Sequence, residues 1–136
     1  MMGDHEDSTG PFNHDAEVAV LAGLMFWSEE LANIQDWLTV DDFHVADHGA
    51  IYGAISDLCA AQKPADGVTV GEWALAQGGE HGRRLNILVT SIAASGYTRA
   101  NVVAYAEIVV EHSRMRRFID TCQRALKAAH SGRGHS

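Results

Sequence analysis

The sequence has little proline, little cysteine, few aromatic residues and no long hydrophobic run. Two prolines among 136 residues, with 46% apolar residues, exclude a disordered chain and indicate one globular domain. Charges or glycines interrupt every apolar segment, and the acidic N-terminus lacks the apolar core of a secretory signal, so no membrane span or signal is expected. The two cysteines, Cys59 and Cys122, lack metal-type spacing. We expect them to be buried free thiols in a reducing cytoplasm.

The motifs of common catalytic centres are also missing. There is no Gly-x-x-x-x-Gly-Lys-Ser/Thr phosphate loop, and the glycine-rich segment 78–83 has no lysine to close it and follows no predicted strand. His44 and His48 are spaced for one helix face, with Asp41 or Asp47 nearby, but a helix that starts at Asp47 leaves His44 outside. A role in a turn and helix cap is favoured over a metal site. We predict no catalytic residue, no cofactor and no metal.

Charge is distributed unevenly along the chain. Residues 1–72 carry 14 acidic residues against Lys63 alone, whereas residues 73–136 carry 4 acidic and 9 basic residues, for a net charge of −8. An acidic chain is a poor general binder of nucleic acid, so no direct tight binding to DNA is expected. The uneven distribution favours self-association or docking of opposite halves. The acidic pairs Glu29-Glu30 and Asp41-Asp42 are interpreted as solvated helix starts.

Helical periodicity runs through the chain, and no segment alternates as a strand does. Helices are predicted from Asn13 or Asp15, from Ser28, from Asp47, from a Thr69–Glu72 capping box, and around Leu85. The expected core residues are Val18, Val20, Leu21, Ala22, Leu24, Met25, Leu31, Ile34, Trp37, Leu38, Phe43, Ile51, Ala54, Ile55, Leu58, Leu85, Leu88, Val89 and Ile92. These segments predict an all-α fold with a compact head of about five helices.

A long segment without glycine or proline, residues 99–129, predicts one long C-terminal helix after the head. Thr98 is the expected cap, and Ser131-Gly132 the expected stop. The apolar side of the helix changes near Ser113. Before it, one side carries Val102, Ala106, Val109 and Val110; after it, the opposite side is apolar. One helix should therefore serve two packing partners. The alternative is a break near Ser113 that gives two helices.

The second half of this helix predicts an interface. Its apolar stripe consists of Met115, Phe118, Ile119, Cys122 and Leu126, with Arg116 and Arg117 beside it. Burying a large apolar side chain is worth about 1.5–3 kcal/mol, and no later segment of this sequence would cover the stripe. We expect a second copy, packed antiparallel about a two-fold axis, or a partner helix. The alternative is a bend at Ser113 that folds the stripe onto the head.

Five segments in order resemble one known family. They are DAEVAVLAGL at 15–24, Asp42-Phe43, HGAIYGAI at 48–55, KPADGVT at 63–69, and NVVAYAEIVVE with RMRRFI between 101 and 119. Over roughly residues 11–126 the chain resembles the N-terminal domain of DnaB-type replicative DNA helicases. The resemblance implies a helical head followed by a helical hairpin. In the family such domains pair through their hairpins into a collar on the helicase ring, where primase or loader proteins dock. Catalysis belongs to a separate ATPase domain.

This sequence contains neither that ATPase domain nor the second arm of the hairpin, and the region from Gly82 to Leu88 is more basic than in the family. The expected organisation is a disordered arm at 1–12, a DnaB N-terminal-like domain at 13–129 and a disordered tail at 130–136. The implied function is a non-catalytic cytoplasmic replication scaffold. It would form a homodimer or higher oligomer and dock replicative helicase, primase or helicase loader. The alternative is a phage or mobile-element regulator that binds these host proteins and inhibits or redirects helicase assembly.

Overall fold

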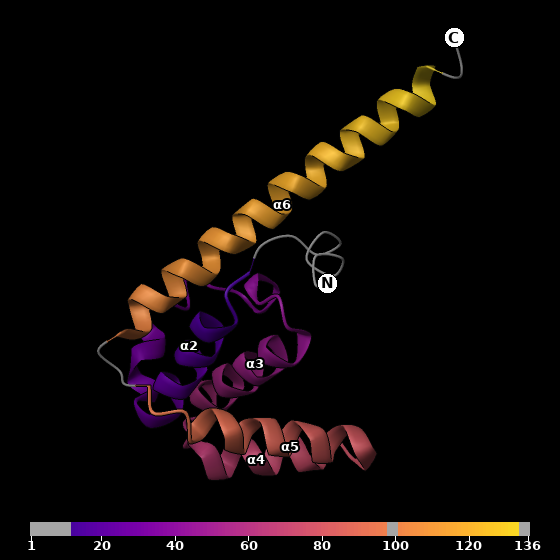
Figure 1. Cartoon of the computed structure of the whole chain (residues 1–136). Coiled ribbons are helices and arrows are strands. Elements are labelled where there is room, and N and C mark those ends of the chain that lie inside the picture. The colour runs from indigo at the N-terminus through magenta and orange to yellow at the C-terminus, as the bar shows by residue number, and fades with distance from the viewer. Residues whose placement is uncertain (1–11, 98–100, 134–136) are drawn as a thin grey trace.

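Helices make up the regular structure of this protein, and the computed structural model describes residues 12–97 and 101–133. The helices are α2 (His14–Phe26), α3 (Ala46–Ala60), α4 (Gly67–Ala76), α5 (Gly79–Ala93) and α6 (Val102–Arg133), with two 3-10 helices, η1 (Ser28–Asn33) and η2 (Val40–Asp42). No strand occurs in these two ranges. The predicted all-α fold, a helical head followed by one long C-terminal helix, is confirmed (Figure 1).

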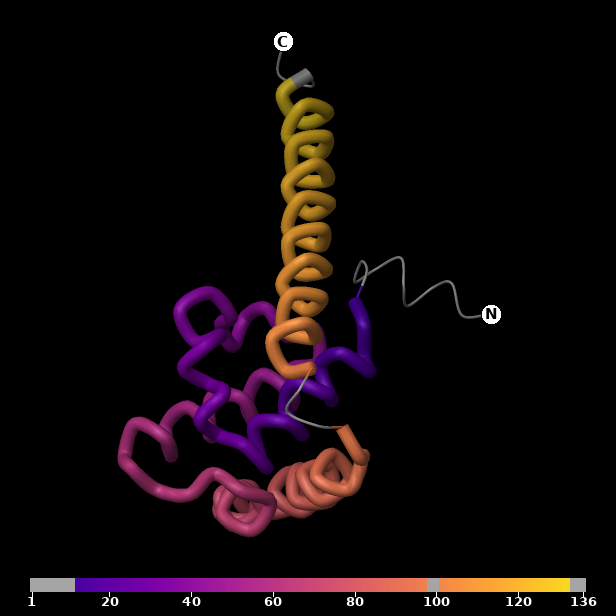
Figure 2. Tube along the Cα trace, turned by 90° about the vertical axis from the view of Figure 1, so that its left-hand side faces the viewer, coloured from indigo at the N-terminus to yellow at the C-terminus, as the bar shows by residue number. Residues whose placement is uncertain are grey.

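Helix α2 forms the centre of the head. Nearly every residue from Ala16 to Met25 is buried, because the helix is apolar on almost all sides and packs against α3, α5 and α6. Helices α4 and α5 pack side by side at the end of the head remote from the tip of α6 (Figures 1 and 2). Of the expected core residues, Val18, Leu58 and Leu88 are only partly buried and Trp37 is 38% exposed. The rest are buried as predicted.

Helix α6 is a single continuous helix, so the alternative of a break near Ser113 is wrong. The part up to Ser113 packs on the head, and the part beyond it projects away from the head as a rod (Figure 2). We call residues 114–133 the arm. The helix also continues past the expected stop, so residues 130–133 are helical rather than part of a disordered tail. The expected cap, Thr98, and residues 1–11 of the expected N-terminal arm lie outside the described residues.

The start of α2 agrees with one of the two predicted caps, whereas α3 and α4 begin earlier than predicted. Asn13, one of two candidates, caps α2 by accepting from the backbone N–H of Ala16 at 2.9 Å. Asp66 caps α4 in a capping box with Thr69, so this helix begins earlier than the predicted Thr69–Glu72 box. Helix α3 begins at Ala46 after Val45, not at Asp47.

The segment between α2 and α3 contains two 3-10 helices where a second α-helix and a linker were predicted. The expected second α-helix is the 3-10 helix η1, after which a turn directs Trp37 outward while Leu31, Ile34 and Leu38 stay buried. The expected linker contains η2, and Phe43 after it enters the core and packs on Tyr52, with ring centroids 5.2 Å apart. Figure 1 places this segment beside the root of α6.

Candidate interface on the C-terminal helix

The side chains that hold the first half of α6 are small or β-branched. Val102, Ala106, Val109 and Val110 are all buried against the head, and Ser113 is the last buried residue, at 1% exposed. Beyond Ser113 the same side of the helix becomes polar and basic. The predicted change of side at Ser113 therefore matches the point where α6 leaves the head.

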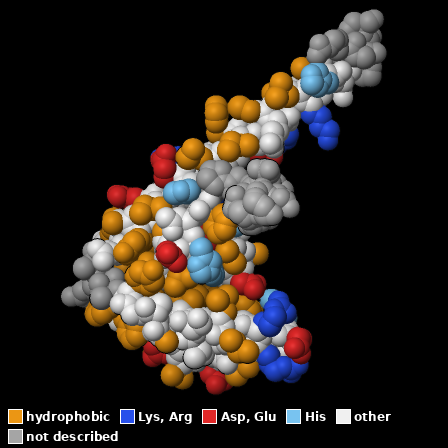
Figure 3. Space-filling model, viewed as in Figure 1, with side chains coloured by type: hydrophobic (Ala, Val, Ile, Leu, Met, Phe, Trp, Pro, Cys, Tyr) orange, Lys and Arg blue, Asp and Glu red, His pale blue; other side chains and the backbone are white. Residues whose placement is uncertain are grey.

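The predicted apolar stripe lies on the arm, and we call Met115, Phe118, Ile119, Cys122 and Leu126 the arm stripe. Met115 is 47% exposed, Phe118 70% and Leu126 62%. Figure 3 shows hydrophobic side chains along one side of the arm and basic ones on the other. The stripe is not folded back on the head, so that alternative is wrong.

Cys122, expected to be buried, is exposed because the arm has no neighbour in this single chain. Cys59 is half-buried in the head, where burial raises the pKa of its thiol despite a hydrogen bond with Ser28.

The two arginines predicted beside the stripe face the head instead. The Arg116 guanidinium donates to the backbone carbonyl of Asp42 at 2.8 Å, and Arg117 donates from both terminal nitrogens to Asp42 Oδ1 at 3.2 Å. Two further basic residues of the arm, Arg124 and Lys127, are exposed, and Arg124 pairs with Asp120 at 3.4 Å. The predicted interface set is therefore divided. Its apolar residues lie on the side of the arm that faces away from the head, and its two arginines contact the head.

The interpretation of Asp41-Asp42 as a solvated pair is wrong for Asp42. Asp41 is exposed, whereas the Asp42 side chain is buried, with the residue 3% exposed, and accepts hydrogen bonds from three residues. Its Oδ1 accepts from Ser113 Oγ at 2.8 Å, and its Oδ2 accepts from the Thr39 backbone N–H at 2.8 Å. Burial raises the pKa of this carboxyl, but hydrogen bonds from Thr39, Ser113 and Arg117 outweigh it and lower the pKa overall. The Thr39–Asp42 spacing is a local capping-box signal, but nothing local marks the contacts with α6, because those partners lie 71–75 residues away.

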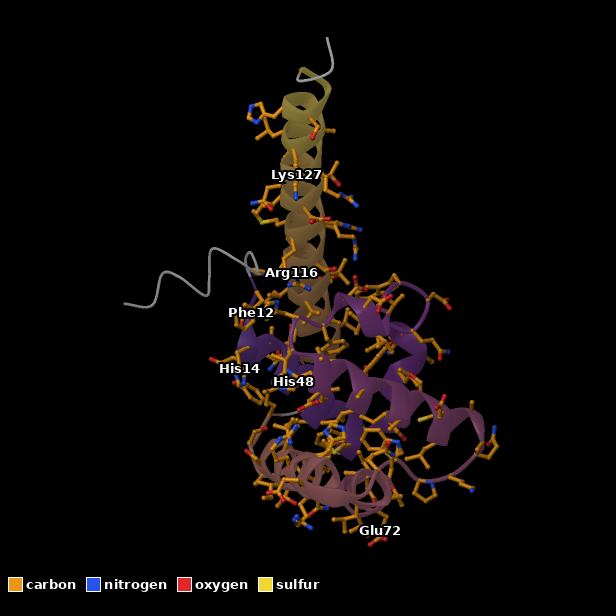
Figure 4. All side chains as sticks on the ribbon, turned by 90° about the vertical axis from the view of Figure 1, so that its right-hand side faces the viewer. Phe12, His14, His48, Glu72, Arg116 and Lys127 are labelled. Carbon is orange, nitrogen blue, oxygen red and sulfur yellow. The ribbon has the colours of Figure 1, made fainter. Side chains whose placement is uncertain are left out.

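Glu17 is a second buried carboxylate that sequence analysis missed. It is 1% exposed and accepts from the backbone N–H groups of His44 at 2.6 Å and Val45 at 3.3 Å, and from His48 Nδ1 at 2.8 Å. His48 is therefore a buried partner of Glu17, not part of a surface turn. His44 stacks on Phe12, with ring centroids 4.0 Å apart, and burial and the nearby Arg116 lower its pKa. Figure 4 shows Phe12, His14 and His48 on the same side of the head, below Arg116 at the root of the arm.

Two hollows are lined by described residues of the chain. A groove of about 400 Å³ lies between η1 and the end of α3, lined by Leu31, Gln35, Ser56 and Cys59 among others. A smaller hollow of about 200 Å³ lies beside Trp37 and α6.

Within residues 12–97 and 101–133, no three His, Cys, Asp or Glu side chains are grouped to hold a metal ion. Among the helices described, none is long and apolar enough to cross a membrane.

Comparison with known proteins identifies the family. The sequence model of the DnaB-like helicase N-terminal domain matches residues 9–111. The replicative DNA helicase DnaB of Leifsonia xyli is 28% identical over 94% of this chain, and the replicative DNA helicase DnaC of Bacillus subtilis is 38% identical over 85%. These matches span only 28% and 25% of the relatives' own lengths.

A solved structure agrees with the sequence comparisons. The crystal structure of the N-terminal domain of DnaB helicase from Mycobacterium tuberculosis is similar with a TM-score of 0.82 and 30% identity. The alignment covers 90% of this chain and 87% of that one. The chain therefore belongs to the family of DnaB-like helicase N-terminal domains.

Proposed function

We propose that this chain is a non-catalytic scaffold of DNA replication. It pairs with a second copy through the arm stripe and presents the heads for docking of a replicative helicase, primase or helicase loader. The observation that carries the proposal is the arm itself, a straight helix clear of the head with Met115, Phe118 and Leu126 exposed on one side. Membership of the replicative-helicase family supports the assignment to replication.

Exposure of the arm stripe is costly unless a partner covers it. Each large apolar side chain gains about 1.5–3 kcal/mol on burial, and a contiguous exposed patch of this kind typically marks an interface. Positions 115, 122 and 129, alternating with 118–119 and 125–126, repeat every seven residues. This spacing is the one with which two helices pack side chains into each other along a seam.

The side chains favour antiparallel pairing centred on Cys122. This register sets Met115 opposite Ala129, Ile119 opposite Ala125 and Phe118 opposite Leu126, so no residue of the stripe except Cys122 meets its own copy. Parallel pairing would instead place each Phe118 against Phe118 and each Glu111 against Glu111. The stripe lies on the side of α6 opposite its buried face, so both heads stay on the outside of the pair.

Docking of partner proteins is the second part of the proposal. Pairing through the arms leaves the heads free, including exposed apolar residues such as Phe26, Val68 and Ile87. We infer that contacts with other replication proteins are made by these surfaces. Direct tight binding of DNA is not part of the role, because the net charge is −8 and the arginines at the root of the arm are engaged by Asp42.

The test is the double variant Met115→Asp with Phe118→Asp. We expect it to keep the helical circular-dichroism spectrum of the parent and to sediment as a monomer in analytical ultracentrifugation, where the parent sediments as a dimer. The matched control is Val68→Asp with Ile87→Asp, which adds the same charges at exposed apolar positions on the head and should stay dimeric. A parent that is monomeric at tens of micromolar, roughly the range for a weak dimer, would refute pairing. Loss of the helical spectrum in the arm variant would also refute it.

A further inference from the structure

Two buried carboxylates join segments that are far apart in the sequence at the root of the arm. Glu17 on α2 holds the segment 44–48 through two backbone N–H groups and His48. Asp42, just before that segment, holds α6 through Ser113, Arg116 and Arg117. Asp42 is itself fixed by the Thr39 backbone N–H and hydroxyl, at 2.8 and 3.2 Å. The chain of contacts therefore runs from α2 through η2 to the first turn of the arm.

The apolar packing of α6 on the head lies before the arm begins. Its buried residues are Val102, Ala106, Val109 and Val110, with Val103, Tyr105 and Ile108 partly buried beside them, and these apolar contacts are non-directional. Beyond this apolar face, the contacts that join α6 to the head include the directional hydrogen bonds from Ser113 and Arg117 to Asp42. The arm from 114 to 133 is about 30 Å long, so a tilt of about 10° at its root moves its tip by about 5 Å.

The geometry points to Asp42 as the positioning residue that fixes the direction in which the arm leaves the head. A carboxylate suits this position because the described partners of the Asp42 side chain are all donors. It accepts from Ser113 and both Arg117 nitrogens on one oxygen and from Thr39 on the other. Its backbone carbonyl adds Arg116. A neutral amide at this position would turn an N–H₂ donor toward either Arg117 or Thr39, which are donors themselves.

This inference goes beyond the proposed scaffold role and holds whether or not two arms pair. The described hydrogen bonds of Asp42 go to Thr39, Ser113, Arg116 and Arg117 and to no residue of the arm stripe, so we expect its effect to be on geometry. When the arm is fixed, a dimer has one separation and one relative orientation of its heads. When the arm is loose, the same interface would connect heads in many orientations. The accuracy with which a scaffold presents its heads would therefore depend on a residue remote from the interface.

The experiment measures the distance between head and arm in the monomer. In the Met115→Asp/Phe118→Asp background, with Cys59→Ser and Cys122→Ser, spin labels are attached at Glu72→Cys on α4 and Ala128→Cys on the arm. Both sites are exposed, and Figure 4 shows Glu72 on the far side of the head from the arm. Pulsed dipolar spectroscopy then gives the distribution of distances between them. Because pairing is abolished in every sample, the outcome is independent of the proposed function.

We expect one narrow distribution for this background and a distribution about twofold broader, or shifted, after Asp42→Asn. The matched control, Asp41→Asn, removes the same charge at the adjacent exposed position and should leave the distribution unchanged. Arg117→Gln should broaden it as well, because this change removes the contact from the arm side and leaves Asp42 and Thr39 intact. It provides the test if Asp42→Asn fails to fold. Unchanged narrow distributions in the folded variants would overturn the inference, as would equal broadening by Asp41→Asn.

Discussion

Asp41 and Asp42 are chemically identical neighbours with opposite environments. Asp41 is exposed, while Asp42 is 3% exposed and accepts hydrogen bonds from Thr39, Ser113 and Arg117. Glu17 shows the same contrast with Asp15, which is exposed in the same first turn of α2. Burial of a carboxylate is unfavourable unless donors surround it, and each of these two has donors from other segments. The acidic composition of residues 1–72 therefore includes two structural carboxylates.

The lowered pKa of Asp42 predicts a pH-dependent contribution to stability. The folded state binds the proton more weakly than the unfolded state, whose aspartate pKa is about 3.9. The contribution is therefore fully present above that value and is lost as the pH falls through the lower folded pKa. Asp42→Asn should reduce the free energy of unfolding by about 2–3 kcal/mol at pH 7. The difference should shrink progressively below about pH 4. Urea titrations of both proteins across this range measure it, and a difference that does not change with pH would contradict the assignment.

At the scale of single helices, the periodic segments and the cap of α2 at Asn13 were predicted, but the start of α4 was not. The start of α4 is set by Asp66, whose Oδ1 accepts from the N–H groups of Val68 at 3.0 Å and Thr69 at 2.9 Å. These hydrogen bonds lower the pKa of the Asp66 carboxyl, although slight burial opposes them. The Thr69–Glu72 pattern also fits a capping box, and the one-dimensional pattern cannot choose between overlapping boxes.

This choice between two boxes gives a direct prediction. Asp66→Ala should lower the free energy of unfolding by about 1 kcal/mol, because it leaves two backbone N–H groups of the first turn without their acceptor. Glu72→Ala is the matched control, since it removes the acid of the other box, and its effect should be within about 0.5 kcal/mol. Chemical denaturation measures both. Equal losses, or a larger loss from Glu72→Ala, would show that the helix starts where the sequence pattern suggested.

At the scale of the whole molecule, the shape is a head with one long arm, and the polarity of pairing decides how two heads are separated. Antiparallel arms centred on Cys122 place the heads at opposite ends of the pair, whereas parallel arms place them at the same end. A parallel pair would bring the acidic surfaces of residues 1–72 together, where like charges repel. Charge therefore favours the antiparallel polarity.

Cross-linking distinguishes the two polarities. In a background without Cys59 and Cys122, one preparation carries Met115→Cys and another carries Ala129→Cys. A short bismaleimide should link a mixture of the two preparations efficiently, because the antiparallel register sets positions 115 and 129 opposite each other. Either preparation alone should link poorly, which a denaturing gel measures. Efficient linking of Met115→Cys with itself would indicate parallel pairing and contradict the proposed register.

The sequence by itself determined the helical class, the order of the helices, most of the core and the side change of α6 at Ser113. These features follow from local periodicity, since which side of a helix is apolar is encoded within a few turns. Only the tertiary structure excluded the alternative break of α6 near Ser113 and decided that Cys122 is exposed and that Glu17 and Asp42 are buried acceptors. The reason is physical. Burial of a charged group depends on donors that folding brings from other segments, and those of Asp42 on α6 lie more than 70 residues away.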